Sequence, residues 1–146
     1  MQLRVAALAA CTTANGNVAI GSEAGDAITT GAGNTAVGTS SLTATSTGAY
    51  NVAVGEGSLN RNTTAGNNTA IGRDAMYYNT TGARNVALGY NALKANTTAG
   101  NNTAVGDGSL STNTTGTNNV AVGLGALEAN TTANNNTAVG YLTMLS

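Results

Sequence analysis

A five-residue pattern recurs in this sequence every 17 residues, with no insertion or deletion between its copies. The pattern reads Asn, then Val or Thr, then Ala, then Val, Ile or Leu, and finally Gly, as in the stretch NVAVG that begins at residue 51. A fixed short period is typical of repeat architectures, in which each unit is stabilised by stacking on its neighbours. The period therefore restricts the possible folds more than any other feature of the chain.

The 17-residue frame covers the whole sequence. Units begin at residues 17, 34, 51, 68, 85, 102, 119 and 136, a partial unit of 16 residues precedes the first of them, and the last stops after 11 residues. We therefore expect residues 1–146 to form a single repeat domain.

Each unit has the features of a short strand between turns. Residues 52–54 are typical of a strand, and Gly55 after them can adopt the positive φ of a tight turn. We expect a second, weaker strand where Ala or Ser precedes Leu, as at residues 58–59, and another turn at the Asn-Thr-Thr of residues 62–64. Seventeen residues are too few for a helical repeat unit. They suit one coil of a β-solenoid, whose coils stack at about 4.8 Å.

The sequence thus predicts an all-β fold, a parallel β-solenoid (β-roll) of about eight to nine 17-residue coils. The lack of Pro agrees, because each Pro would remove a hydrogen bond between coils. The second position of the pattern alternates strictly, from Val18 and Thr35 to Val120 and Thr137. A 34-residue coil would separate Val and Thr onto two faces, and duplication of a 34-residue unit explains the alternation equally well. We favour the 17-residue coil, because a longer coil would enclose more space than these small side chains fill.

Identical residues lie above one another in such a stack, so the first position of the pattern predicts a ladder of asparagine amides. Amide ladders of this kind stabilise stacked β-structures. The expected ladder residues are Asn17, Asn34, Asn51, Asn68, Asn85, Asn102, Asn119 and Asn136.

The strand is apolar on both faces. Val52 and Val54 point one way and Ala53 the other, because residues i and i+2 of a strand share a face. We assign the narrow Ala column to the coil interior and the Val, Ile or Leu column to the outside. There it forms a stripe larger than a soluble monomer usually exposes, which predicts a homo-oligomer. The expected interface residues are Val37, Val54, Ile71, Leu88, Val105, Val122 and Val139.

The NVAVG and NTAIG units, each followed by an Ala- or Ser-containing stretch and a polar turn, resemble the head repeats of trimeric autotransporter adhesins. They also resemble similar repeats of phage tail-fibre proteins. The resemblance covers essentially the whole chain. It implies a left-handed parallel β-roll with three chains around an axis. We expect an extracellular, cell-surface or virion location. The sequence departs from these families in its longer units and in showing no coiled-coil stalk, neck, membrane anchor or C-terminal chaperone domain. Attachment to a surface or virion is therefore not implied with the fold.

The composition offers no set of groups for catalysis. The chain has no His, a net charge of −1, and acids that share no repeated column, so we expect solvated surface charges. These acids are Glu23, Asp26, Glu56, Asp74, Asp107 and Glu128. Cys11, with no His partner, is expected to be an inert thiol. We expect no enzyme activity, no cofactor and no metal. The low charge and the interrupted apolar runs predict neither nucleic-acid binding nor membrane insertion.

Two further features concern the surface. We interpret the Asn-x-Thr sequons as turn residues, with glycan attachment in a secretory pathway as the alternative. They begin at Asn62, Asn67, Asn79, Asn96, Asn101, Asn113, Asn130 and Asn135. The tyrosines are few and scattered. They could contact a glycan or a neighbouring subunit, or they could be exposed turn residues with no specific role. They are Tyr50, Tyr77, Tyr78, Tyr90 and Tyr141.

Three functions fit such a solenoid. The leading hypothesis is a structural subunit of an extracellular or virion fibre, a homo-oligomer whose uncapped ends dock end to end. The alternative is an adhesin or receptor-binding module that contacts carbohydrate or matrix. The third is ice binding, because some plant ice-binding β-rolls have similar Asn-x-Val-x-Gly units. Against it, Thr97 and Thr98 are adjacent and do not alternate across one face.

Overall fold

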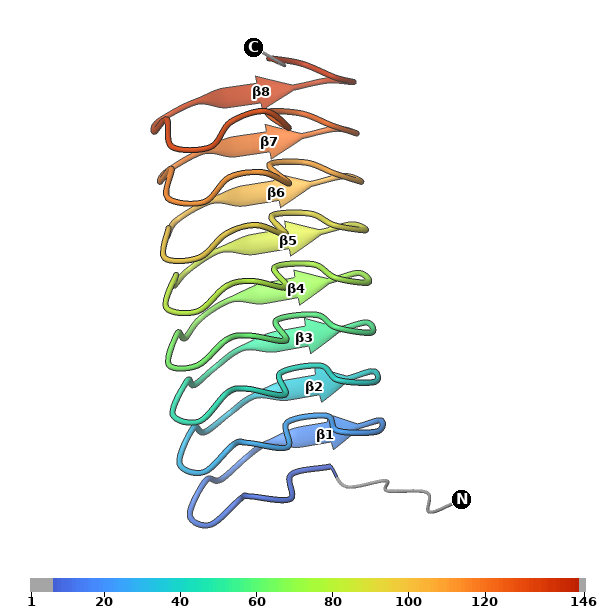
Figure 1. Ribbon diagram of the computed structural model, residues 1–146, viewed down its shortest axis with the longest axis vertical. Helices are drawn as coiled ribbons and strands as arrows, with labels where there is room; N and C mark the ends of the chain where they lie inside the picture. Colours follow the sequence, from blue (N-terminus) through green and yellow to red (C-terminus); the bar gives the residue numbers. More distant parts are fainter. Residues whose placement is uncertain (1–6, 145–146) are drawn as a thin grey trace.

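The computed structural model describes residues 7–144; residues 1–6 and 145–146, which belong to the two partial units, lie outside the described part. Eight three-residue strands form one parallel sheet, in which they follow sequence order from one end of the stack to the other (Figure 1). The strands are β1 (Val18–Ile20), β2 (Thr35–Val37), β3 (Val52–Val54), β4 (Thr69–Ile71), β5 (Val86–Leu88), β6 (Thr103–Val105), β7 (Val120–Val122) and β8 (Thr137–Val139). The described residues contain no helix, and the predicted all-β parallel β-solenoid is confirmed.

The strand register fixes the length of one coil. Val52 of β3 lies beside Thr69 of β4, and Thr69 lies beside Val86 of β5, so each residue pairs with the residue 17 positions later. The 17-residue coil is therefore confirmed. The 34-residue coil is excluded, because Val and Thr alternate within one column and do not separate onto two faces.

The predicted number of eight to nine coils is slightly too high. Seven pairings with the same register join the eight strands. The described residues before β1 follow the path of the coil, with Leu8 N donating to Ala24 O at 3.1 Å, but they form turns and no strand. The strand position of that partial unit falls on residues 1–3, outside the described part.

Backbone hydrogen bonds join successive coils at both ends of each strand. Val52 N donates to Asn68 O of the next coil at 2.8 Å, and Gly55 N donates to Val37 O of the previous coil at 2.7 Å. Gly55 has a φ of 127°, a conformation that favours glycine, so the predicted turn after the strand is confirmed.

The second strand expected in each unit is wrong. Residues 58–59 and their equivalents form turns, and Leu59 has a φ of 49°. Ser58 N donates within its own coil to Gly55 O, whereas Leu59 N donates to Ala75 O of the next coil, so no regular ladder forms. A left-handed residue costs about 1–2 kcal/mol. Full burial of the Leu59 side chain offsets this cost, because burying a leucine contributes about 1.5–3 kcal/mol.

The interior is one narrow apolar core. The alanines in the middle of β2 to β8 are buried and form a single cluster with the Leu or Met of the facing turn, as Ala53, Leu59, Ala70 and Met76 do, and the partly buried Ala19 of β1 packs against it. The prediction that the Ala column faces inward is therefore confirmed.

The coil that contains β1 exchanges two side chains relative to the others. Gly25 occupies the place of the buried Leu, and Ile28, which is 1% exposed, occupies the place taken by Asn62 in a later coil. A Cβ added to Gly25 would lie 3.0 Å from Ile28 Cδ1 and 3.2 Å from Leu8 Cδ2. The isoleucine thus fills the space that the missing leucine leaves.

This exchange predicts strong coupling between the two positions. We expect Gly25→Leu alone to lower the free energy of unfolding by about 1–3 kcal/mol through overpacking. We expect Ile28→Asn alone to lower it by about 2–4 kcal/mol, because it buries a polar group and leaves a cavity. The double variant recreates the Leu and Asn arrangement of the coils of β3, β5, β6 and β7, and should recover at least about 1 kcal/mol relative to the sum of the single changes. Urea denaturation gives the free energy of unfolding of all three variants. Strictly additive losses would contradict the idea that the Ile28 side chain fills the space left at Gly25.

Candidate functional site

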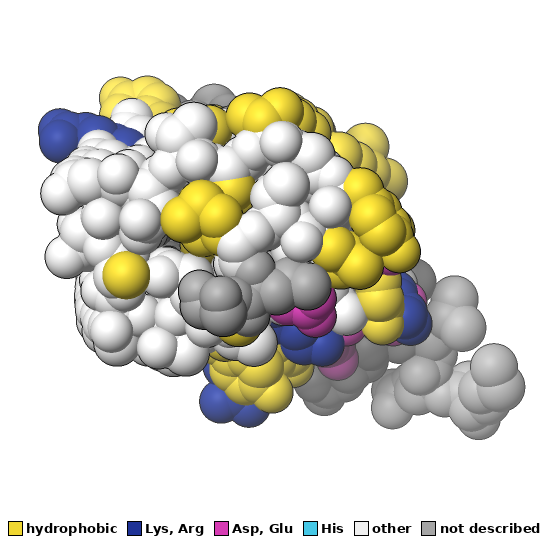
Figure 2. Space-filling view, turned by 90° about the horizontal axis from the view of Figure 1, so that it is seen from above, with side chains coloured by type: hydrophobic (Ala, Val, Ile, Leu, Met, Phe, Trp, Pro, Cys, Tyr) yellow, Lys and Arg dark blue, Asp and Glu magenta, His cyan; other side chains and the backbone are white. Residues whose placement is uncertain are grey.

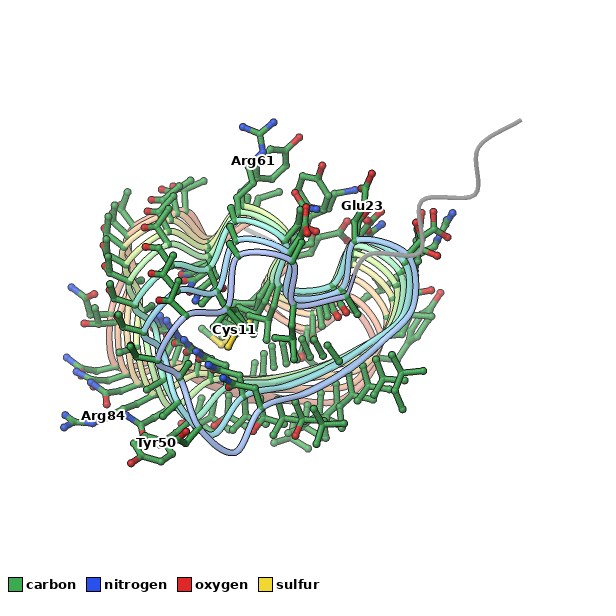
Figure 3. All side chains as sticks on the ribbon, turned by 90° about the horizontal axis from the view of Figure 1, so that it is seen from below. Cys11, Glu23, Tyr50, Arg61 and Arg84 are labelled. Atoms are coloured by element: carbon green, nitrogen blue, oxygen red, sulfur yellow. The ribbon has the colours of Figure 1, made fainter. Side chains whose placement is uncertain are left out.

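Each coil presents three sides to solvent. The strand side carries the strands. The variable side is formed by the six residues after the glycine that ends each strand, such as residues 56–61, and the threonine side by the next six, such as residues 62–67. In a view along the stack, Glu23 and Arg61 lie on the variable side, opposite the strands (Figure 3). Tyr50 and Arg84 lie at the corner between the threonine side and the strand side, and Cys11 points inward (Figure 3).

The predicted asparagine column lies inside the stack, one residue before each strand. Asn51 Oδ1 accepts a hydrogen bond from Asn68 N of the next coil at 3.1 Å, and Asn51 Nδ2 donates to Ala65 O of its own coil at 2.9 Å. The bond to the next coil recurs along the column from Asn17 to Asn136. The bond within the coil recurs from Asn17 to Asn119. Each amide therefore closes one coil and holds the next, a structural role that requires Asn at every step.

A second asparagine ladder runs beside the first and was missed in the sequence analysis. Asn79 Nδ2 donates to Asn62 Oδ1 at 3.0 Å and to Gly82 O at 2.9 Å. The ladder consists of Asn62, Asn79, Asn96, Asn113 and Asn130, and the first four are fully buried. The 17-residue period already aligned these residues. Their interpretation as polar turn residues concealed that they point inward.

This second ladder divides the predicted sequons into two groups. A glycan on Asn79 Nδ2 would remove the hydrogen bonds of a buried amide, and the same holds for the other buried members of the ladder. Asn67, Asn101 and Asn135 instead lie exposed at the corner before a strand, with φ values near 60°. The structure therefore argues against glycan attachment to the buried group, and the alternative interpretation of the sequons applies only to the exposed group.

The column predicted as an oligomer interface points outward on the strand side. Ile71 is 42% exposed and Val139 68% exposed, and the column runs beside the alternating Val and Thr column. The strand side of the eight coils carries no charged residue between β1 and β8. Hydrophobic side chains gather in a band along this side, and most of the charged side chains lie on the opposite side (Figure 2).

Charged and aromatic residues that are scattered in the sequence gather on the variable side. All six acids lie there, together with Arg61, Arg73 and Lys94. Four of the five tyrosines, Tyr77, Tyr78, Tyr90 and Tyr141, lie on the same side, whereas Tyr50 is at the corner. The position of each residue within the 17-residue period was the signal that could have located this side.

The densest part of the variable side lies in the coils of β3, β4 and β5. Tyr77 and Tyr78 are packed edge to face, with ring centroids 4.8 Å apart. The Arg61 guanidinium carbon lies 5.9 Å from the Tyr77 centroid and 5.3 Å from the Tyr78 centroid. Arg73 lies over the Tyr90 ring in the same way, at 4.7 Å. These cation–π contacts favour the observed orientation of the rings by about 0.5–1 kcal/mol each.

The two threonines of each Asn-Thr-Thr turn have different roles. Thr97 Oγ1 donates to Thr114 O of the next coil at 3.1 Å, whereas Thr98 is exposed to solvent. The second threonine position of the turn is exposed in every coil and forms a row on the threonine side. The row consists of Thr13, Thr30, Thr47, Thr64, Thr81, Thr98, Thr115 and Thr132.

Residues 7–144 offer little else for chemistry. No three His, Cys, Asp or Glu side chains in this range lie close enough together to hold a metal ion. The Cys11 thiol is exposed and donates to Ala14 O at 3.6 Å. Within the same range, no helix has the length and apolar character needed to cross a membrane.

The geometry defines a parallel β-solenoid with an uncharged strand side and a charged, aromatic variable side. Comparisons with protein-family models, with curated proteins and with solved structures find no match.

Proposed function

We propose that this protein is a non-catalytic structural subunit whose strand side is an interface between copies of the chain. The observation that carries the proposal is the outward column of Val, Ile and Leu, which is continuous over β1 to β8 and free of charge. Ile71, in the middle of the stack, is 42% exposed in the single chain. Large apolar patches on a soluble monomer mark interaction surfaces, because their burial is favourable.

A second copy of the chain is the occupant that fits this surface best. The column repeats once per coil, so an identical column on a partner meets it at the same spacing along the whole stack. The neighbouring row of alternating Val and Thr is also uncharged, so no charge has to be desolvated when the sides meet. We propose a homotrimer, as the resemblance to adhesin heads and tail fibres implies, and we propose that it forms part of an extracellular or virion fibre. End-to-end stacking of such rods stays a prediction.

Adding one charge to the strand side tests the proposal. We expect wild-type protein to sediment as an oligomer and Ile71→Lys to sediment as a monomer, with association weakened about 100-fold or more by the desolvation and mutual repulsion of the new charges. Thr64→Lys is the matched control, because it adds the same charge at an exposed position on the threonine side. Sedimentation equilibrium checks all three proteins. A wild-type chain that stays monomeric at high concentration would rule the interface out.

The variable side supports a second candidate function, a module that binds a ligand at a surface. Its charged and aromatic residues gather opposite the strand side and stay exposed if the strand side is covered (Figure 2). This arrangement suits an adhesin, in which one side assembles the fibre and another contacts the ligand. The ice-binding interpretation stays a prediction. The structure gives it one row of exposed threonines, and a measurement of thermal hysteresis tests it.

A further inference from the structure

The variable side has a shallow depression of about 240 Å³ in the coils of β4 and β5. Asp74, Tyr77, Tyr78 and Lys94 line it. Lys94 Nζ lies 3.4 Å from Asp74 Oδ2, and both side chains are partly exposed, so the pair keeps hydrogen-bonding capacity toward solvent. The rim therefore offers one acceptor group and one donor group with no net charge between them.

The aromatic wall of this depression is contacted by an arginine of the preceding coil. Arg61 lies over both the Tyr77 and the Tyr78 rings, and the two rings are packed at an interplanar angle of 71°. Tyr78 nevertheless remains 43% exposed. An exposed aromatic ring beside paired polar groups is thus available on the variable side, whereas the threonine side carries no aromatic or charged residue apart from the corner before each strand.

We propose that this depression binds one ring of a neutral sugar. A pyranose has an apolar C–H face, which packs on an aromatic ring, and a rim of hydroxyl groups, which needs both donors and acceptors. Tyr78 supplies the ring, Asp74 accepts from hydroxyls, and Lys94 donates to them. The paired charges of Asp74 and Lys94 favour a neutral ligand over an anionic one. The small volume accommodates a single ring, with any remaining glycan extending into solvent.

This inference rests on the second candidate function, and it does not depend on oligomerisation through the strand side. Saturation-transfer NMR tests it with methyl glycosides of glucose, galactose, mannose and N-acetylglucosamine, and with N-acetylneuraminic acid as the anionic comparator. We expect at least one neutral glycoside to bind with a dissociation constant on the order of millimolar. Tyr78→Ala should weaken that binding about tenfold. Asp74→Asn, which keeps the shape of the side chain, should weaken it several-fold.

Tyr50→Ala is the matched control, because Tyr50 is 66% exposed but lies at a corner away from the depression. This variant should bind like wild type. Far-UV circular dichroism confirms that each variant is folded before binding is compared. The proposal is overturned if no neutral glycoside binds up to about 50 mM, if the acidic sugar alone binds, or if folded Tyr78→Ala binds as well as wild type. Sedimentation of the same samples reports the strand-side interface separately, so failure of one proposal leaves the other open to its own test.

Discussion

Replacing Gly89 by alanine is expected to destabilise the solenoid strongly, because the added methyl group would collide with the backbone of the next coil. The new Cβ would lie 2.6 Å from Gly106 O and 2.7 Å from Gly106 C of the next coil, and the φ of Gly89 is 136°. Both contacts are with backbone that is itself hydrogen-bonded between coils, Gly106 N donating to Leu88 O at 2.8 Å. Neither side can yield without separating the coils. We expect the free energy of unfolding to fall by about 3 kcal/mol or more.

Gly108→Ala is the control for this prediction. Gly108 also has a positive φ, 65°, but no atom lies within 4 Å of an added Cβ. The control should therefore show the backbone strain alone, about 1 kcal/mol. Urea unfolding followed by circular dichroism compares the two variants. Equal losses in the free energy of unfolding would contradict the prediction, because they would show that the close contact between Gly89 and Gly106 adds nothing to the backbone strain.

Replacing Asn85 by alanine should be nearly as costly, because this fully buried side chain belongs to the first asparagine ladder. The variant removes the acceptor of Asn102 N, which donates to Asn85 Oδ1 at 2.9 Å, and leaves a cavity. Ala99 O loses Asn85 Nδ2 but keeps a second donor, Asn96 Nδ2 at 3.0 Å. One backbone N–H is thus buried without a partner, and we expect a loss of about 2–4 kcal/mol in the free energy of unfolding.

Asn101→Gly controls for the loss of an asparagine as such. Asn101 is exposed at the corner with a φ of 60°, which glycine adopts without strain, so its replacement should change stability by less than about 0.5 kcal/mol. In thermal unfolding, Asn85→Ala should have a much lower melting temperature than both Asn101→Gly and wild type. A similar melting temperature for the two variants would show that the buried ladder adds little to stability.

The strict period made the path of the backbone predictable. Stacking at a fixed spacing leaves little freedom in the register, so the strand of each coil and the inward Ala column follow from the pattern. The second strand failed for a physical reason. Leu59 reaches the interior through a left-handed residue, which a propensity argument assigns to Gly or Asn, and burial of the leucine outweighs that preference.

The candidate site was harder to predict than the fold. Tyr77, Asp74 and Lys94 come from two coils, and their proximity depends on which residues of the long turn point outward. The buried Asn79 and the exposed Asn67 carry the same Asn-x-Thr motif, and local sequence does not tell them apart. Their positions within the coil distinguish them: Asn79 follows the turn that carries the buried Met76, whereas Asn67 lies at the corner before β4.

The uniform strand register has a consequence for how such a molecule changes size. Each strand contacts only the strands directly before and after it, so inserting or deleting one 17-residue unit leaves every other coil as it was. Such an event would alter the length of the rod by one graduation of about 4.8 Å and keep its cross-section. The length of the solenoid is therefore expected to increase in equal steps with the number of repeats in the sequence.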